Sequence, residues 1–361
     1  MKDFEIRRDR EFLMKRMGDI SQLAGAKRYE LLDGKAKGVE AVDIKTGTGL
    51  EFTVLPGRGM DIAWAGFRGV PVSYISKTGI VSPAYYESDG MNWLRSFFAG
   101  LLTTCGLSNV GGPCEEEDEL LGMRKYGLHG RISNSAADNV CVSEEWQDDD
   151  YIMTVSGRLR ESVLHGENLS LRRVISAKMG ENRLTVRDVV ENEGFKENPL
   201  MLLYHINFGY PILDDGSRLV CSSADITPND SLARGNLDIY DAMNAPEKGA
   251  RENLYFHDLN AAGDGTAYAG LINERLELGA YVKFNKAQLP KLAQWKQLSE
   301  AEYVLGIEPS NCYPVGRVEQ RKRGGLEYLK PGEKRVFELE IGLLTDLKQI
   351  TEFEGMVKSR V

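Results

Sequence analysis

Apolar and polar residues alternate with a period of two through most of the chain, the pattern of β-strands that bury one face. The alternation is clearest in RVFELEIGLL, where Phe337, Leu339 and Ile341 stand at every second position. The same pattern predicts further strands at 49–56, 139–146, 151–160, 169–178, 182–192, 202–208, 267–273, 279–285 and 302–308. Short turn signals such as MGEN, ENEG and DDGS separate several of them, which favours a mostly antiparallel sandwich or barrel over a parallel sheet.

Helical spacing of apolar residues is confined to three short segments, at 8–23, 91–100 and 345–361. The last opens with Thr345 as the expected N-cap and repeats apolar residues along one side. We interpret these segments as covers over sheet edges. The sequence therefore predicts one all-β domain over 1–361, with 1–25 and 345–361 as peripheral helical covers. The apolar side of the C-terminal helix is also a surface that could serve a homodimer.

Composition and charge limit the classes of partner. The 361 residues are 42% hydrophobic and 27% charged, with a net charge of -9. This charge argues against nucleic acid and against anionic membranes as partners. No stretch approaches 18 apolar residues, so we expect no membrane span, and the N-terminus lacks the apolar centre of a secretory signal. Five widely spaced cysteines disfavour a zinc ribbon or a disulfide scaffold, and we expect a cytoplasmic protein.

One of only four histidines lies inside an apolar strand-like run, LLYHINFGYP (202–211). In a strand over 202–208 the even-numbered residues form an apolar face, and His205 shares the other face with Asn207. Two interpretations remain open. The polar pair either lies on the open surface of a sheet that binds a polar ligand, or consists of core groups with backbone partners.

His129 in YGLHGR and Glu308 in YVLGIEPSN stand in similar settings. Each follows an apolar run and precedes a Gly or Pro, so each is expected near a strand end where a sheet opens to ligand. Glu308 would share a face with Gly306, whose missing side chain leaves room for a ring against the backbone. The alternatives are a Glu308 that points to water and a His129 that caps a turn.

The order of these motifs resembles the aldose 1-epimerase (galactose mutarotase) superfamily, and most closely its branch known as domain of unknown function 4432. The segments that carry the likeness are LPGRGMDIAWAGFRGVPVSYIS, WLRSFFAGLLTTCGLSNVGGP, YGLHGR, NPLMLLYHINFGYP, LPKLAQWKQ and YVLGIEPSN. The resemblance implies a galactose mutarotase-like antiparallel β-supersandwich with one concave sheet that binds a monosaccharide substrate.

The resemblance also implies a chemistry. Opening a hemiacetal ring requires removal of a proton from the anomeric hydroxyl and delivery of one to the ring oxygen. Glu308 is the candidate base and His205 the candidate acid, and no cofactor is required. His129 corresponds to a sugar-binding histidine of the superfamily.

The remaining candidate substrate contacts come from side chains that can hydrogen bond to a sugar, namely Arg58, Arg131, Asn207, Thr104 and Asn109. For the two arginines a structural salt bridge is an equal alternative. Trp93 and Trp295 offer apolar faces for stacking. The substrate-binding aspartate of the better-known mutarotases has two candidates here, Asp225 and Asp238, and the sugar and the epimerised carbon are not specified by the sequence.

Two rival functions belong to other classes. Two histidines and a glutamate also form the facial triad of metal enzymes, which would suit a metal-dependent sugar isomerase. Cupin ligands are closely spaced, however, whereas His129 and His205 stand 76 positions apart, so no metal is expected. A non-catalytic carbohydrate-binding protein is the third possibility, but a binder has no need for an acid and a base together. His165 and His257 are interpreted as surface residues.

Overall fold

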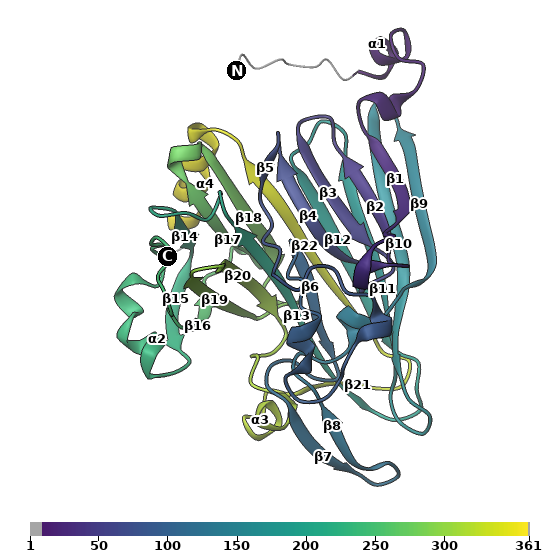
Figure 1. The fold of residues 1–361 in the computed structure, drawn as a ribbon, viewed down its shortest axis with the longest axis vertical. Coiled ribbons are helices and arrows are strands. Elements are labelled where there is room, and N and C mark those ends of the chain that lie inside the picture. Colours follow the sequence, from purple (N-terminus) through teal and green to yellow (C-terminus); the bar gives the residue numbers. More distant parts are fainter. Residues whose placement is uncertain (1–8, 360–361) are drawn as a thin grey trace.

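Two large antiparallel sheets form the frame of the computed structural model, which describes residues 9–359 (Figure 1). The first sheet has 12 strands. Ten of them form a continuous path in the order β1 (Gly25–Glu30), β2 (Glu40–Lys45), β3 (Leu50–Leu55), β4 (Asp61–Phe67), β6 (Leu102–Leu107), β13 (Asn198–Gly209), β20 (Glu302–Ser310), β19 (Lys291–Ser299), β16 (Asn253–Leu259) and β15 (Ser223–Pro228). The remaining two, β5 (Val70–Pro71) and β21 (Glu327–Leu329), pair with β4 and β13.

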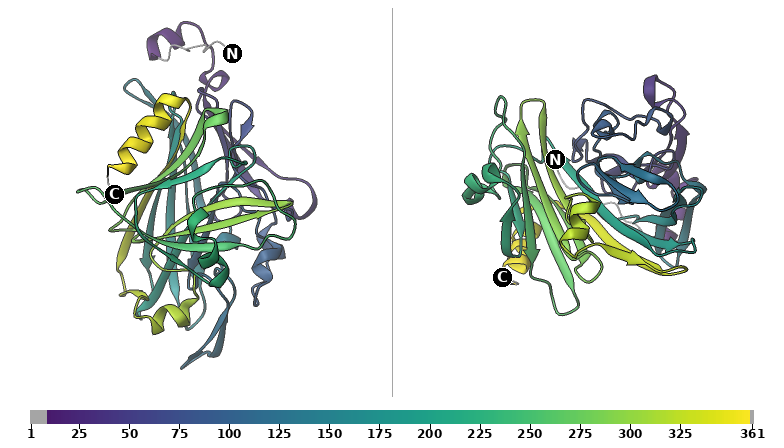
Figure 2. Two further views of the ribbon diagram at one scale, coloured as in Figure 1. Left: turned by 90° about the vertical axis from the view of Figure 1, so that its left-hand side faces the viewer. Right: turned by 90° about the horizontal axis from the view of Figure 1, so that it is seen from below.

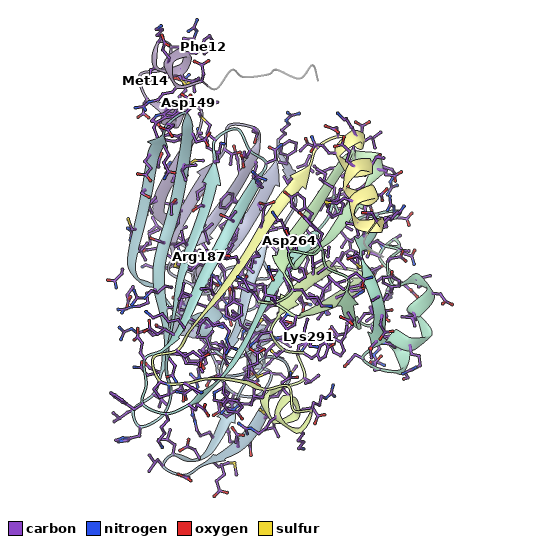
Figure 3. All side chains as sticks on the ribbon, turned by 180° about the vertical axis from the view of Figure 1, so that it is seen from behind. Phe12, Met14, Asp149, Arg187, Asp264 and Lys291 are labelled. Carbon is purple, nitrogen blue, oxygen red and sulfur yellow. The ribbon has the colours of Figure 1, made fainter. Side chains whose placement is uncertain are left out.

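The second sheet has eight strands and packs behind the first. Its order is β14 (Arg218–Cys221), β17 (Thr266–Asn273), β18 (Leu278–Asn285), β22 (Lys334–Leu344), β12 (Arg183–Asn192), β11 (Asn168–Lys178), β10 (Asp150–Ser162) and β9 (Asp138–Gln147). Figure 3 views this sheet from behind, with Arg187 of β12 on its exposed face. A separate hairpin joins β7 (Cys114–Asp118) to β8 (Gly122–Tyr126), and most of the acidic run at 114–120 lies in β7.

The main hydrophobic core lies between the two sheets. Along β13 the even-numbered residues Leu202, Tyr204, Ile206 and Phe208 all belong to this core, as the alternation predicts. Their odd-numbered neighbours lie on the opposite face of the first sheet, which we call the outer face. His205 is therefore excluded from the main core by strand geometry alone, because successive side chains of a strand point to opposite sides.

Each predicted strand overlaps a strand of the structure, so the all-β prediction is confirmed. The helical predictions are confirmed in part. Segment 8–23 contains α1 (Arg10–Met14) and the 3-10 turn η1 (Ile20–Gln22), and 91–100 contains only the 3-10 turn η4 (Asn92–Arg95). The further helical elements are α2 (Ser231–Gly235), α3 (Arg317–Lys322), η2 (Gly34–Ala36), η3 (Pro83–Tyr85), η5 (Ile132–Asn134), η6 (Leu237–Ile239) and η7 (Glu274–Leu276).

The C-terminal helix α4 (Leu347–Lys358) differs from its prediction in its cap. Asp346, and not Thr345, is the N-cap residue, because its carboxylate accepts a hydrogen bond of 2.8 Å from the backbone N–H of Gln349. The apolar side of α4 packs on the end of the second sheet through Ile350 and Phe353 (Figure 2). That side is therefore covered by the chain itself. Within residues 9–359 no helix is long and apolar enough to cross a membrane.

Candidate active site

His205 and Glu308 meet on the outer face because their strands are neighbours in the first sheet. In the antiparallel register Leu203 lies opposite Ser310 and Ile206 opposite Ile307, which brings His205 opposite Glu308. Directly opposed residues point to the same side of a sheet. The Nε2 atom of His205 lies 3.2 Å from Oε1 of Glu308, and both side chains are buried, at 7% and 3% exposed. Two residues 103 positions apart are thus placed in contact by strand pairing.

Aromatic rings surround the histidine of this pair. The ring centroids of Phe97 and Trp295 lie 5.2 and 5.3 Å from that of His205. The His129 ring is 5.9 Å away, nearly perpendicular, and itself packs against Trp93 at 4.8 Å. Trp93 and Trp295, predicted as apolar faces, are therefore both next to the histidines. Apolar surroundings of this kind strengthen electrostatic interactions within the site.

Three polar atoms of this site lack a hydrogen-bond partner among the described residues, although all three are buried. They are Nδ1 of His205, Oδ1 of Asn207 and Oε1 of Glu308, whose contact with His205 lacks hydrogen-bond geometry. The amide nitrogen of Asn207, by contrast, donates to the carbonyl oxygens of Gly100 and His205. Buried polar groups are normally paired, so an unpaired set on one face is a mark of a place that receives a ligand or water.

Burial dominates the protonation of the pair. It raises the pKa of Glu308 to about 8, and the nearby Glu252 carboxylate adds to the rise. Burial also lowers the pKa of His205 to about 3, with a further contribution from His129, whose own pKa falls to about 4 for the same reason. At neutral pH the empty site therefore holds one proton on the carboxyl group and two neutral imidazoles. In this resting state Glu308 can donate a proton and His205 can accept one.

Gly306 lets the side chains of the pair lie close against the backbone of β20. A methyl group built on its Cα would lie 2.6 Å from Oε1 of Glu308 and 3.3 Å from Cε1 of His205. It would also lie 3.1 Å from Cβ of Trp295. These distances are shorter than ordinary contacts, so only glycine accommodates these side chains at this position. The expectation that Gly306 leaves room for a ring against the backbone stays a prediction, because the Glu308 carboxyl group and the His205 ring occupy this position in the structure.

His129 reaches the site from a tight turn and not from a strand. Its backbone has a positive φ of 56°, a left-handed conformation that few residues other than glycine adopt. The turn is held on both sides, because the N–H of His129 donates to Gly111 and its carbonyl oxygen accepts from Gly106. Its Nδ1 accepts a long hydrogen bond of 3.4 Å from the N–H of Gly111. The ring is thus fixed next to His205 by backbone contacts.

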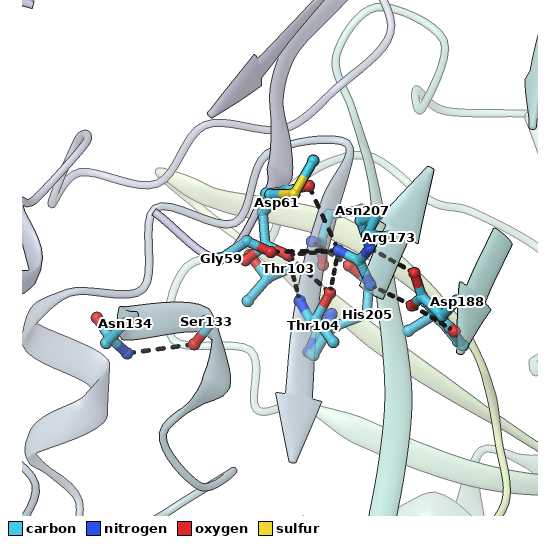
Figure 4. A network of polar contacts seen from close by, with 12 residues as sticks. Gly59, Asp61, Thr103, Thr104, Ser133, Asn134, Arg173, Asp188, His205 and Asn207 are labelled. Carbon is cyan, nitrogen blue, oxygen red and sulfur yellow. Dashed lines mark hydrogen bonds and ion pairs between the residues drawn. The ribbon is translucent and has the colours of Figure 1, made fainter. Parts of the chain in front are cut away.

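Thr104 lies on the core side of its strand and not on the side of His205. It pairs with Tyr204, whereas the residue opposite His205 is Thr103. The Thr104 hydroxyl donates to Asp61 at 2.7 Å and accepts from Arg173 at 2.8 Å. Figure 4 shows this buried network, in which Arg173 reaches Asp61 and Thr104 on one side and Asp188 on the other.

The other predicted contacts hold the structure around the site. The guanidinium of Arg58 is fully buried and donates to the carbonyl oxygens of Val81 and Ser96 and to Oδ1 of Asn134. Asn109 joins three loop segments through the carbonyl oxygens of Gly111, Gly112 and Gly127 and through the N–H of Arg317. Arg131 is exposed at the start of η5.

Three features of the site and its surroundings do not follow from the sequence reasoning. Phe97 adjoins His205, and Glu252 accepts a hydrogen bond of 2.7 Å from the indole N–H of Trp295. Neither has a motif that could have identified it. His257 was expected at the surface, but it is 1% exposed and contacts Ser223 and Gln294. That expectation is wrong, and the alternation of LYFHDL, in which His257 follows Tyr255 on the inner face, was the available signal. His165 is exposed as expected.

Across 9–359 no three His, Cys, Asp or Glu side chains come together in a way that could hold an ion. Glu308 contacts His205, and Glu252 accepts a hydrogen bond from the indole N–H of Trp295.

Comparison with known proteins agrees with this architecture. Residues 36–343 match the family described as domain of unknown function 4432 (DUF4432). A solved structure titled "putative aldose 1-epimerase", from Klebsiella pneumoniae, is 26% identical and superposes with a TM-score of 0.87, covering 94% of this chain and 90% of its own. Galactose 1-epimerase from Lactobacillus acidophilus is 14% identical, with a TM-score of 0.58 over 90% of this chain and 99% of its own. A search of curated proteins finds no significant match. The fold is therefore galactose mutarotase-like.

Proposed function

The chain belongs to the DUF4432 family, and we propose that it acts as an aldose 1-epimerase, which interconverts the anomers of a monosaccharide without a cofactor. The observation that carries the proposal is the contact between His205 and Glu308, buried at 3.2 Å among aromatic rings. The structural likeness to proteins titled as aldose and galactose 1-epimerases supports the substrate class.

The reaction needs a base at the anomeric hydroxyl and an acid at the ring oxygen, two atoms that are both bonded to the anomeric carbon. Glu308 removes the proton of the anomeric hydroxyl while His205 delivers a proton to the ring oxygen, and the C1–O5 bond breaks to give the open-chain aldehyde. Rotation about C1–C2 presents the other face of the carbonyl. Ring closure then returns both protons with the roles of the two groups reversed, so the site ends as it began.

The resting proton lies on Glu308, so the roles above require the ionised form of the pair. Moving one proton from the carboxyl group to the imidazole leaves the net charge of the pair unchanged. That transfer therefore adds no net charge to the buried site, unlike the ionisation of either group alone. Asn207 and His129 are the proposed binding residues, supported by the unpaired Oδ1 of Asn207 and by the position of the His129 ring beside His205.

The test is an NMR measurement of exchange between anomeric signals over a panel of aldohexoses, pentoses, deoxysugars, ketoses and uronates. We expect the wild-type protein to accelerate exchange for at least one class. His205→Ala and Glu308→Gln should each reduce the rate by about 10² to 10⁴-fold. Glu308→Gln is the more informative variant, because it keeps the shape of a carboxyl group that is already neutral in the resting site.

Circular dichroism and thermal unfolding of both variants provide the control. A folded Glu308→Gln protein with wild-type exchange rates would remove the assigned roles. Binding of a sugar without any acceleration of exchange, in the wild-type protein, would favour a carbohydrate-binding protein over an enzyme.

A further inference from the structure

A second concave region lies on the outer face of the first sheet, over β1 to β5. Its volume is about 890 Å³, within the range of small-molecule sites. The lining comes from these strands and the turns beside them, and none of it from the second sheet. The lining residues used below are Lys27, Asp43, Lys45, Glu51, Trp64 and Ser73. We call this region the Trp64 groove.

Strand register explains how the groove is built. Lys27 is paired with Asp43, and Asp43 with Thr53, so these side chains form one polar row across three strands. A second row runs from Lys45 through Glu51 to Gly66. The glycine has no side chain to fill the space over β4. Trp64 stands at the rim of this space with 42% of its surface exposed.

The groove and the candidate active site share a wall. Ser73 and Ile75 line the groove, whereas Tyr74 between them packs against the aromatic cluster of the site. Successive side chains of this extended segment therefore point alternately to the groove and to the site. The segment is fixed to the strand of His205, because the N–H of Tyr74 donates to the carbonyl oxygen of Asn207 at 3.2 Å and Ser73 bridges to Phe208. A ligand in the groove is therefore separated from the site by this single extended segment.

Charge and chemistry define the ligand that this surface fits. The two lysines are matched by one aspartate and one glutamate, so the groove has no excess of either sign and offers no special attraction to an anion. An exposed indole provides a flat apolar face, and the surrounding carboxylates, ammonium groups and hydroxyls donate and accept hydrogen bonds. A neutral sugar has flat apolar ring faces with hydroxyl groups around them, and it therefore matches this surface.

We propose that the Trp64 groove is a second carbohydrate-binding subsite, which takes neutral saccharide units beside the candidate active site. Stacking on Trp64 supplies most of the binding, and the rows that contain Asp43 and Glu51 orient the hydroxyl groups. The subsite does not depend on turnover, so it can exist whether or not the neighbouring pair is catalytic.

The experiment measures binding of maltotriose, cellotriose and xylotriose by calorimetry and by saturation-transfer NMR. The proteins are the wild type, Trp64→Ala, Trp64→Phe and Phe195→Ala. Phe195 is the matched control, because its ring is 98% exposed and does not line the groove.

We expect at least one trisaccharide to bind, with an affinity lowered about tenfold or more in Trp64→Ala, which is about 1.4 kcal/mol. Trp64→Phe should recover part of this loss, and Phe195→Ala should bind as the wild type does. Failure of all three probes to bind, or equal binding by Trp64→Ala, would overturn the proposal. It would also be overturned if sedimentation showed that Trp64→Ala dissociates a dimer while no trisaccharide binds, since the groove would then be an interface.

Discussion

The two faces of β13 carry polar clusters of opposite character. On the core face Arg173 is fully buried and donates to both oxygens of Asp188 and to Thr104, while Tyr204 adds a hydrogen bond to Asp188. On the outer face His205 and its neighbours keep three buried atoms that find no hydrogen-bond partner within residues 9–359. Adjacent residues of one strand thus belong to a largely satisfied cluster and to an unsatisfied one.

The difference distinguishes buried polar groups that stabilise the fold from buried polar groups of a functional site. A buried ion pair with its hydrogen bonds in place holds two sheets in register, and loss of one partner leaves an uncompensated charge. A buried pair whose polar atoms lack hydrogen-bond partners has instead a desolvation cost that no partner offsets. This is the state expected of a binding site without its substrate. The core cluster is not perfect, since Oδ2 of Asp61 lacks a partner and burial raises the pKa of Asp61 to about 7.

The largest expected effect is on stability. Asp188→Ala removes the partner of Arg173 and Tyr204 between the sheets, and we expect a loss of about 3 to 5 kcal/mol in the free energy of unfolding. Denaturant titration measures it. Arg187→Ala is the control, because this neighbouring residue is half exposed and pairs with Glu338 at the surface, so its loss should cost about 0.5 kcal/mol or less. Equal losses in the two variants would contradict the structural role of the Arg173 cluster.

The next effect is on activity alone. Gly306→Ala adds a methyl group 2.6 Å from Oε1 of Glu308, which displaces the carboxyl group. The backbone of Gly306 does not have a positive φ, so alanine fits the strand itself. We expect kcat/KM for the responsive sugar to fall by about 10²-fold, because small displacements of a catalytic group are costly. Unchanged kinetics would show that substrate does not occupy this space.

A pH profile tests the protonation of the outer-face pair. The single proton of the pair stays bound until the pH rises through the raised pKa of Glu308, about 8, and a second enters only near the lowered pKa of His205, about 3. We therefore expect kcat/KM to be constant from weakly acidic to neutral pH and to fall about tenfold per unit above about pH 8. Glu252→Gln should move this alkaline limb to lower pH, because the Glu252 carboxylate contributes to the raised pKa.

A limb that begins near the ordinary pKa of a histidine, about 6.5, would indicate a different acid. The same profile measured on Phe195→Ala provides the control for effects of a remote surface change.

The smallest expected effects distinguish the two threonines of β6. Thr104→Val removes hydrogen bonds to Asp61 and Arg173, so we expect a loss of about 1 to 3 kcal/mol in stability with unchanged kcat/KM. The comparison variant is Thr103→Val. Thr103 lies on the side of His205, where its hydroxyl donates to the carbonyl oxygen of Ala99. A greater change in kcat/KM from Thr104→Val than from Thr103→Val would reverse the assignment of the faces.

The sequence predicted the positions of the strands well. It predicted the face of the sheet to which a given side chain points for some residues and not for others. The period of two located the strands and correctly divided β13 between its faces, because alternation is a property of the backbone itself. Thr104 was proposed as a sugar contact because TTCG has no apolar alternation from which its side could be read. The sidedness of Thr104 follows only from its pairing with Tyr204, which lies 100 positions further along the chain.

Long-range contacts account for most of what the sequence could not provide. Arg58 has the residue type of a sugar ligand, yet its three partners come from segments between 81 and 134, and all of them are structural. The approach of His205 to Glu308 was inferred from a resemblance and not from spacing. Phe97 and Glu252 had no signal, because rings and carboxylates are common and only the folded chain shows which of them face a histidine.

The pairing of β13 sets a limit on how the protein can be altered. A one-residue insertion or deletion within this strand would exchange its two sides, directing Tyr204 outward and His205 into the hydrocarbon between the layers. Both clusters would be lost in a single step, although no functional side chain had been replaced. Changes of length are therefore far more damaging here than changes of residue type, and redesign of specificity belongs in the loops and the flanking strands.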